Sequence, residues 1–157
     1  MKYISIWLTS ASIGLIATTV FAQEKMSTYV ELNRTAELCF DLATTGSDQF
    51  ASLAGHGYRI SKKRKKTSYK KGVGFHLFGA AGIDVFKYRT GCTINGRGIS
   101  DTKANIVYKK LQAQLISAGY QRGGNIFKKG SLTVILKGKY LLQGGTAVLT
   151  IYRDDDT

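Results

Sequence analysis

Two segments of the chain repeat apolar residues at the three- and four-residue steps of a helix that is buried along one side. The first begins at Thr28, whose spacing to Glu31 is that of a capping box at a helix N-terminus. Its apolar face consists of Leu32, Ala36, Cys39 and Ala43. Gly46 would end this helix, and Ser47 would then cap a short second helix.

The other helical segment lies in the C-terminal half of the chain. Ser100 or Asp101 would cap it, and Gly119 would end it. Its apolar face consists of Ala104, Val107, Leu111, Leu115 and Ala118. Lysines and glutamines occupy the opposite side, so we expect this helix to cover a core with one face and to meet water with the other.

After each helical segment, β-branched and aromatic residues alternate with polar ones, and glycines mark the turns. The pattern predicts strands at 67–70, 73–78 and 83–95, the last interrupted at 89–91, and at 125–128, 131–138 and 144–152. Along the closing strand, Val148, Thr150 and Tyr152 fall on one side. Sequential strands joined by short turns pair antiparallel. The predicted fold class is therefore α+β, with helices packed on one face of an antiparallel sheet.

The two halves of the chain share motifs in the same order. A glycine-rich helix exit ending at Tyr58 matches one ending at Tyr120, and an aromatic-Lys-Lys-Gly element occurs at 69–72 and again at 127–130. We interpret this similarity as an internal duplication, with units at about 27–97 and 98–153. Since neither unit is large enough to bury its own apolar face, both would form one domain over 23–157.

Composition places the chain among small basic globular proteins. Its 157 residues include 23 Lys and Arg against 10 Asp and Glu, a formal charge of +13. Hydrophobic residues make up 43% and aromatic residues 11%, which excludes a disordered polypeptide. The length favours a single domain.

The N-terminus has the features of a secretory signal peptide over residues 1–22. Lys2 precedes a mostly apolar stretch that ends before Ala22, a small residue suited to a cleavage site. An uncleaved membrane anchor is the alternative, but it needs about 20 apolar residues, and serines and threonines interrupt this stretch. We therefore expect a periplasmic or extracellular protein, with no transmembrane segment after signal cleavage.

Secretion also affects how the two cysteines are interpreted. An even number of cysteines in an oxidising compartment favours a disulfide between Cys39 and Cys92. A reactive thiol would need a basic neighbour at a helix N-terminus, and neither cysteine has this setting in the sequence. The bond would join the first helix to the last strand of the same unit.

The basic cluster, as we call residues 59–71, contains eight basic residues and no acidic one. Its members are Arg59, Lys62, Lys63, Arg64, Lys65, Lys66, Lys70 and Lys71. Relative to the second unit it falls largely in an insertion, which we expect to be a loop or an extension of a strand. It is either a solvated segment that keeps the protein soluble or a site that captures an anionic partner.

No residue pattern predicts catalysis, a metal site or a cofactor. His56 follows a glycine-flanked helix exit and His76 lies within a predicted strand, so the two histidines lack metal-ligand spacing. We predict a binding module of the inhibitor or adaptor type. Its partner would be lipopolysaccharide, anionic lipid, an acidic protein or an acidic glycan, with nucleic acid as a further candidate. The alternative is an envelope structural or assembly protein that docks another protein through its sheet, with its charge incidental.

Overall fold

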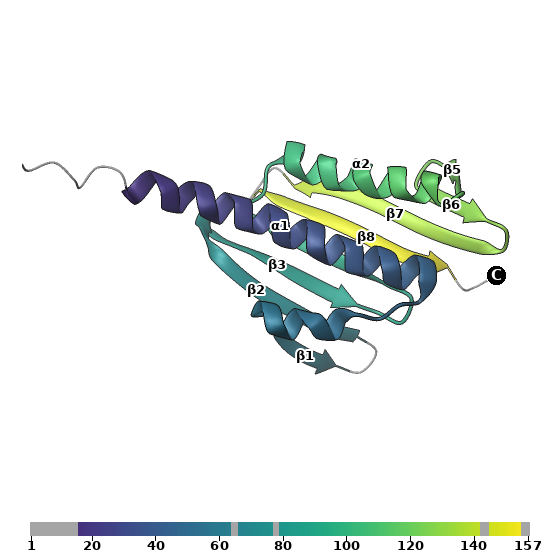
Figure 1. Cartoon of the computed structure of the whole chain (residues 1–157), viewed down its shortest axis with the longest axis horizontal. Coiled ribbons are helices and arrows are strands. Elements are labelled where there is room, and N and C mark those ends of the chain that lie inside the picture. The colour runs from purple at the N-terminus through teal and green to yellow at the C-terminus, as the bar shows by residue number, and fades with distance from the viewer. Residues whose placement is uncertain (1–15, 64–65, 77–78, 142–144, 155–157) are drawn as a thin grey trace, which may run out of the picture.

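The computed structural model describes residues 16–63, 66–76, 79–141 and 145–154 and contains a layer of helices and a layer of strands (Figure 1). The helices are α1 (Ile16–Thr45), the 3-10 helix η1 (Phe50–His56) and α2 (Asp101–Ser117). The strands of the first half are β1 (Arg59–Lys63), β2 (Lys66–His76), β3 (Gly79–Lys87) and β4 (Gly91–Arg97). Those of the second half are β5 (Gln121–Gly123), β6 (Ile126–Lys129), β7 (Leu132–Leu141) and β8 (Thr146–Asp154).

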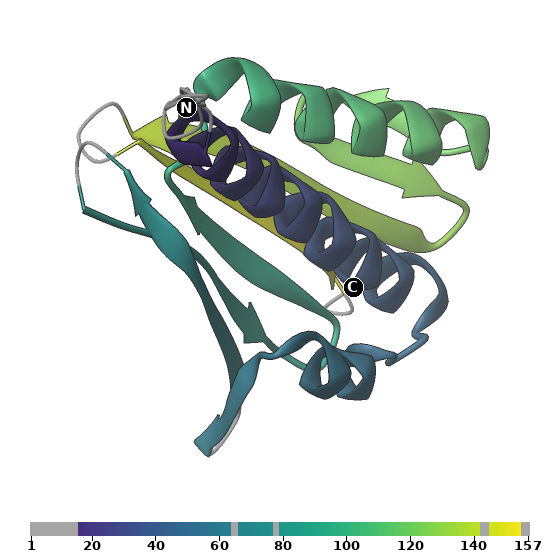
Figure 2. The same cartoon turned by 60° about the vertical axis from the view of Figure 1, so that its left-hand side comes forward.

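The described strands form one sheet in the order β1-β2-β3-β4-β8-β7-β6-β5. Every neighbouring pair is antiparallel, and the last strands of the two halves, β4 and β8, pair in the middle. The helices lie on one face of this sheet (Figure 2). The structure therefore confirms the predicted α+β fold class. The internal duplication stays a prediction.

The first helix begins earlier than the sequence pattern predicts. It extends from Ile16, and Thr28 lies inside it, fully buried and with no hydrogen-bond partner for its hydroxyl among the described residues. The predicted capping box is therefore wrong. The part of α1 that precedes Thr28, residues 16–27, contains no glycine or proline, so no residue in it stops the helix. Gly46, with φ of 77°, ends α1 as predicted.

The basic cluster forms a β-hairpin rather than a loop. Its first part is β1, which pairs residue by residue with the start of β2. A row of lysines is compatible with an edge strand, because every residue of β1 is exposed and charged side chains discourage pairing with a further chain. The pairing with β1 on one side and β3 on the other merges two predicted strands into one long β2.

The core lies between α1 and the centre of the sheet. The predicted apolar face of α1 is confirmed, since Leu32, Ala36 and Cys39 have no exposed surface. This face packs on β4 and β8, where Ile94 and Ile151 are equally buried. Helix α2 covers β7 and β8 beside α1. Burying these side chains removes apolar surface from water, which stabilises the fold by about 25 cal/mol per Å².

Cys39 on α1 and Cys92 on β4 lie at disulfide-bonding distance, with their Cα atoms 5.7 Å apart. Both residues are buried in the core. This placement confirms that the two cysteines can form the predicted bond, which fixes the helix layer to a central strand. The bond closes a loop between positions 53 residues apart in the sequence.

We predict that replacing both cysteines, in Cys39→Ala/Cys92→Ala, lowers the free energy of unfolding by about 4 kcal/mol, because the unfolded chain regains the entropy of a long open loop. Urea unfolding of the oxidised protein and of the variant measures this difference. Reduction of the natural chain should produce a similar loss. Two free thiols in the non-reduced secreted protein, detected by alkylation and mass spectrometry, would contradict the bond itself.

Candidate functional site

Side chains of the sheet alternate between a face that the helices cover and a face that no described element covers (Figure 2). On β4, Cys92 and Ile94 are buried under α1, whereas Thr93 and Asn95 lie on the opposite side and are only part-buried. We call this uncovered side of the sheet the open face. Residues from both halves of the chain lie together on it.

The β1–β2 hairpin places half of the basic cluster on the open face. Tyr69 is buried on the helix side, so its neighbours Lys70 and Ser68 lie on the open face. Arg59 pairs directly with Lys70, and Lys63 pairs with Lys66, so these four basic residues share that face. The ammonium of Lys66 lies 5.2 Å from the centre of the Phe86 ring, which belongs to the same face of β3.

The other members of the basic cluster are placed elsewhere. Lys62 pairs with Thr67 and projects on the helix side of the sheet edge. Lys71 also lies on the helix side, where it donates to a carboxylate of α1. Arg64 and Lys65 lie outside the described residues.

Lys71 belongs to a buried cluster around Glu31 of α1. The Glu31 carboxylate accepts hydrogen bonds from the Lys71 ammonium at 2.8 Å, the Tyr58 hydroxyl at 2.9 Å and the Arg34 guanidinium at 2.8 Å. Burial by itself raises the pKa of Glu31, but the hydrogen bonds from Lys71 and Tyr58 and the charges of Lys71 and Arg34 lower it below its ordinary value. Lys71 thus has an anionic partner within the chain.

Basic residues from β4, β6 and β7 extend the charge across the open face. Their alternation with buried residues, such as Val134 and Leu136 on β7, places them on the side away from the helices. They are Arg97, Lys128, Lys137 and Lys139. With the four from the hairpin, eight basic residues share this face with two acidic ones, Asp84 and Asp154, in the described part of the chain.

Most of these basic side chains have no partner. Only Arg97 makes an ion pair within the described residues, with Asp84 at 3.6 Å. Six of the eight have neither an ion pair, a hydrogen bond nor a ring contact with any described residue. These six are Arg59, Lys63, Lys70, Lys128, Lys137 and Lys139.

Several cations on the helix side, in contrast, are engaged by polar groups of the fold. Lys110 pairs with Glu37 at 2.7 Å, Lys87 pairs with Asp48, and Lys129 donates to the Ala118 carbonyl at 2.7 Å. The carboxylates of α1 and of the segment after it therefore neutralise lysines within the fold. Among the described strands, six of the seven cations without a partner therefore lie on the open face, and Lys62 is the one on the helix side.

The centre of the open face is uncharged. The Thr93 and Thr150 hydroxyls lie 3.2 Å apart across the β4–β8 pair. Phe86 on β3 and Tyr152 on β8 are part-buried on the same side. The site thus has an uncharged middle with lysines and arginines on both flanks, the arrangement of a macromolecular interface.

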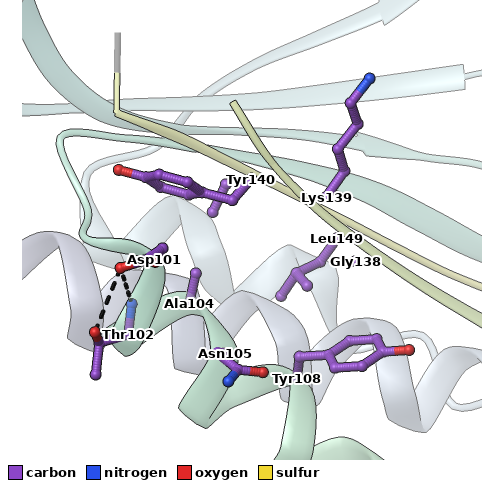
Figure 3. Close-up of a pocket in the computed structure, with 10 residues that line it drawn as sticks. Asp101, Thr102, Ala104, Asn105, Tyr108, Gly138, Lys139, Tyr140 and Leu149 are labelled. Atoms are coloured by element: carbon purple, nitrogen blue, oxygen red, sulfur yellow. Dashed lines mark hydrogen bonds between the residues drawn. The ribbon is translucent and has the colours of Figure 1, made fainter. Parts of the chain in front are cut away.

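A pocket of about 420 Å³ lies on the other side of the sheet, between α2 and the β7–β8 pair (Figure 3). The small residues Ala104 and Gly138 are among those that line it, and the Tyr108 ring lies against Gly138. Several of its polar groups already have hydrogen-bond partners within the fold. The Asp101 carboxylate accepts from the Thr102 backbone at 2.6 Å, the Tyr108 hydroxyl donates to Asn125, and the Tyr140 hydroxyl donates to the Ile99 carbonyl. The pocket therefore offers few free groups to orient a ligand.

Comparison with protein-family models, with curated proteins and with solved structures finds no match to this chain. The function is therefore argued from the site.

The sequence predicts the hairpin residues of the candidate site but not the basic residues that β4, β6 and β7 add to it. Strand alternation could have placed Lys137 and Lys139 on this face. Each is an odd number of positions from the buried Val134 and Leu136, so its side chain lies on the opposite side of the strand. Their approach to the hairpin depends on the central β4–β8 pairing, which joins positions far apart in the sequence. No local pattern predicts such a pairing.

The Glu31 cluster predicts a stability that depends on pH. Because the pKa of Glu31 is lower in the folded than in the unfolded chain, the cluster stabilises the fold at pH values above the ordinary pKa of a glutamate. That contribution is lost as the pH falls through the lowered pKa. We expect Glu31→Gln to cost about 1–3 kcal/mol at neutral pH, and this cost should diminish on acidification.

Urea unfolding between neutral and acidic pH measures the cost of Glu31→Gln. Glu37→Gln is the matched control, because its partner Lys110 is exposed and such pairs contribute about 0–1 kcal/mol. Equal effects of the two variants at neutral pH would contradict a special role for Glu31.

Proposed function

We propose that this protein is a secreted binding module of the inhibitor or adaptor type that captures an anionic partner on the open face. The observation that carries the proposal is the set of six basic side chains on that face without a partner among the described residues. They come from both halves of the chain, so the site is the face of the sheet rather than the basic cluster alone.

Charge physics supports this assignment. Cations gathered on one surface produce a potential that attracts anionic partners and accelerates their encounter. Near an anionic membrane surface each basic residue contributes about 1 kcal/mol, and the contribution decreases with ionic strength. The six unpartnered groups of the open face therefore add to this attraction, whereas cations that are already paired with carboxylates contribute little to the field.

The second candidate function is envelope assembly, in which the sheet docks another protein and its charge is incidental. The part-buried Phe86 and Tyr152 at the centre of the open face favour this candidate, because aromatic side chains are enriched in protein interfaces. Salt dependence separates the two functions. Capture through charge weakens as ionic strength rises, whereas docking through apolar contacts does not.

Capture by the whole open face predicts that lysines far from the basic cluster also matter. Lys63→Gln/Lys70→Gln and Lys137→Gln/Lys139→Gln each remove two charges, from opposite flanks of the face. We expect each pair to weaken binding to anionic phosphatidylglycerol vesicles, lipopolysaccharide, heparin or single-stranded DNA, whichever of these the protein binds, and to reduce its salt dependence. Titration at several ionic strengths measures both effects.

The matched control is Lys103→Gln/Lys109→Gln, which removes the same charge from α2 on the helix side. It should leave affinity nearly unchanged. Equal losses in all three variants would show that net charge, not the open face, determines binding. Affinity and salt dependence that survive both open-face variants would exclude capture.

Secretion is part of the proposal and rests on two observations, the N-terminal sequence and the cysteine pair. The N-terminal sequence has the features of a signal peptide. The two cysteines lie at disulfide distance, which is typical of oxidising compartments. Among the helices in the described ranges, none combines the length and the apolar composition needed to cross a membrane.

Cleavage after Ala22 predicts a mature chain that begins at Gln23. The buried residues of α1 from Thr28 on lie after this cleavage site, so the mature chain keeps them. We expect intact-mass spectrometry of the protein recovered from the periplasm or medium to give this N-terminus. Recovery of a chain that retains residues 1–22 would contradict the proposed signal peptide.

A further inference from the structure

We infer that the partner on the open face is an acidic protein element with an apolar ridge, which lies on a stripe of Tyr152, Ile135 and Ile126. This inference rests on the proposed function and specifies the class of its anionic partner. The apolar stripe, as we call these three residues, crosses β8, β7 and β6. It is the part of the open face that charge alone does not explain.

The strand register places the stripe residues side by side. Tyr152 pairs directly with Ile135, and Ile135 pairs directly with Ile126. The residues before and after Ile135, Val134 and Leu136, are buried under the helices, so Ile135 itself lies on the open face. Directly paired residues on one face of a sheet have Cβ atoms about 5 Å apart. The stripe is therefore a continuous apolar surface across three strands.

Lysines lie on both sides of the apolar stripe. Lys137 follows Ile135 by two positions on β7, and Lys128 follows Ile126 by two positions on β6. Because β6 and β7 are antiparallel, the two lysines lie on opposite sides of the stripe. Asp154 pairs with Thr133 on the Lys128 side, and it is the acidic residue nearest to the stripe in this register. A partner with acidic residues on both sides of an apolar ridge complements this pattern.

The stripe distinguishes a protein from the other anionic partners. Two of its three members are aliphatic, so they offer no ring on which nucleotide bases can stack. Ile135 and Tyr152 are part-buried among their neighbours, whereas binding to a bilayer requires apolar side chains that protrude into it. An apolar strip between charged flanks matches the buried centre and polar rim of protein interfaces. The observations therefore favour an acidic protein.

The test compares four defined probes for binding to the mature protein. The first is an amphipathic helical peptide with leucines along one side and glutamates on both flanks. The second is a shuffled peptide of the same composition without the apolar ridge. The third is phosphatidylglycerol vesicles, and the fourth is a single-stranded oligothymidylate. Fluorescence titration at fixed ionic strength gives the affinity for each.

We expect the ridge peptide to bind more tightly than the shuffled peptide. Ile135→Thr keeps a β-branched residue in the strand and should weaken ridge-peptide binding about tenfold, equivalent to about 1.4 kcal/mol. It should leave binding of the shuffled peptide unchanged. Ile116→Thr is the matched control, because Ile116 is exposed on α2, away from the open face.

The alternative outcomes separate this inference from the proposed function. If the two peptides bind equally, or if Ile135→Thr has no effect, the stripe does not recognise a ridge and the inference is wrong. Tighter binding to vesicles or to the oligonucleotide also overturns it, in favour of lipid or nucleic acid. In each case, a loss of binding in Lys137→Gln/Lys139→Gln would still support anion capture. If no probe depends on these lysines, the proposed function itself fails.

Discussion

The packing of α1 across the two central strands is the interaction on which the rest of the structure depends. Strands β4 and β8 come from different halves of the chain, and one helix buries the inner side chains of both. The Cys39–Cys92 pair connects this helix to β4, and the Glu31 cluster connects it to Tyr58 and to Lys71 of β2. Because these contacts hold the helix layer to one face, the opposite face of the sheet stays accessible to a partner.

The same packing separates engaged from unengaged charge. Carboxylates at Glu31, Glu37 and Asp48 lie in the helix layer or directly after α1, within reach of lysines from the sheet and from α2. Each of these ion pairs neutralises one positive charge on the helix side of the sheet. Charged side chains that only keep a protein soluble can lie on any part of its surface. The location of most of the sheet's unpaired cations on the open face is therefore what supports the binding role that we propose.

Periodicity predicts those parts of the fold that depend on neighbouring residues. The apolar face of α1, that of α2 apart from the exposed Ala118, the stop at Gly46 and the alternation of β8 all follow from local spacing and are confirmed. The predicted start of α1 was wrong because a cap at Thr28 competes with a preceding segment that also favours a helix. Strand β1 was not predicted because four of its five residues are polar and all five are exposed, so the strand gains its order from pairing with β2.

The candidate site was only half predictable, for a related reason. The hairpin cations are neighbours in sequence, so composition alone identifies them. Lys128 and Lys137 reach the same face only because β8 lies beside β4, and the apolar stripe exists only because Tyr152, Ile135 and Ile126 are aligned by two further pairings. A shift of one residue in either pairing would carry an entire strand's side chains to the opposite face. The inner residues, Val134, Leu136 and Ile151, oppose that shift because it would expose them to water. The buried core thus fixes the register that assembles the open face, and the site depends on the core although none of its residues belongs to it.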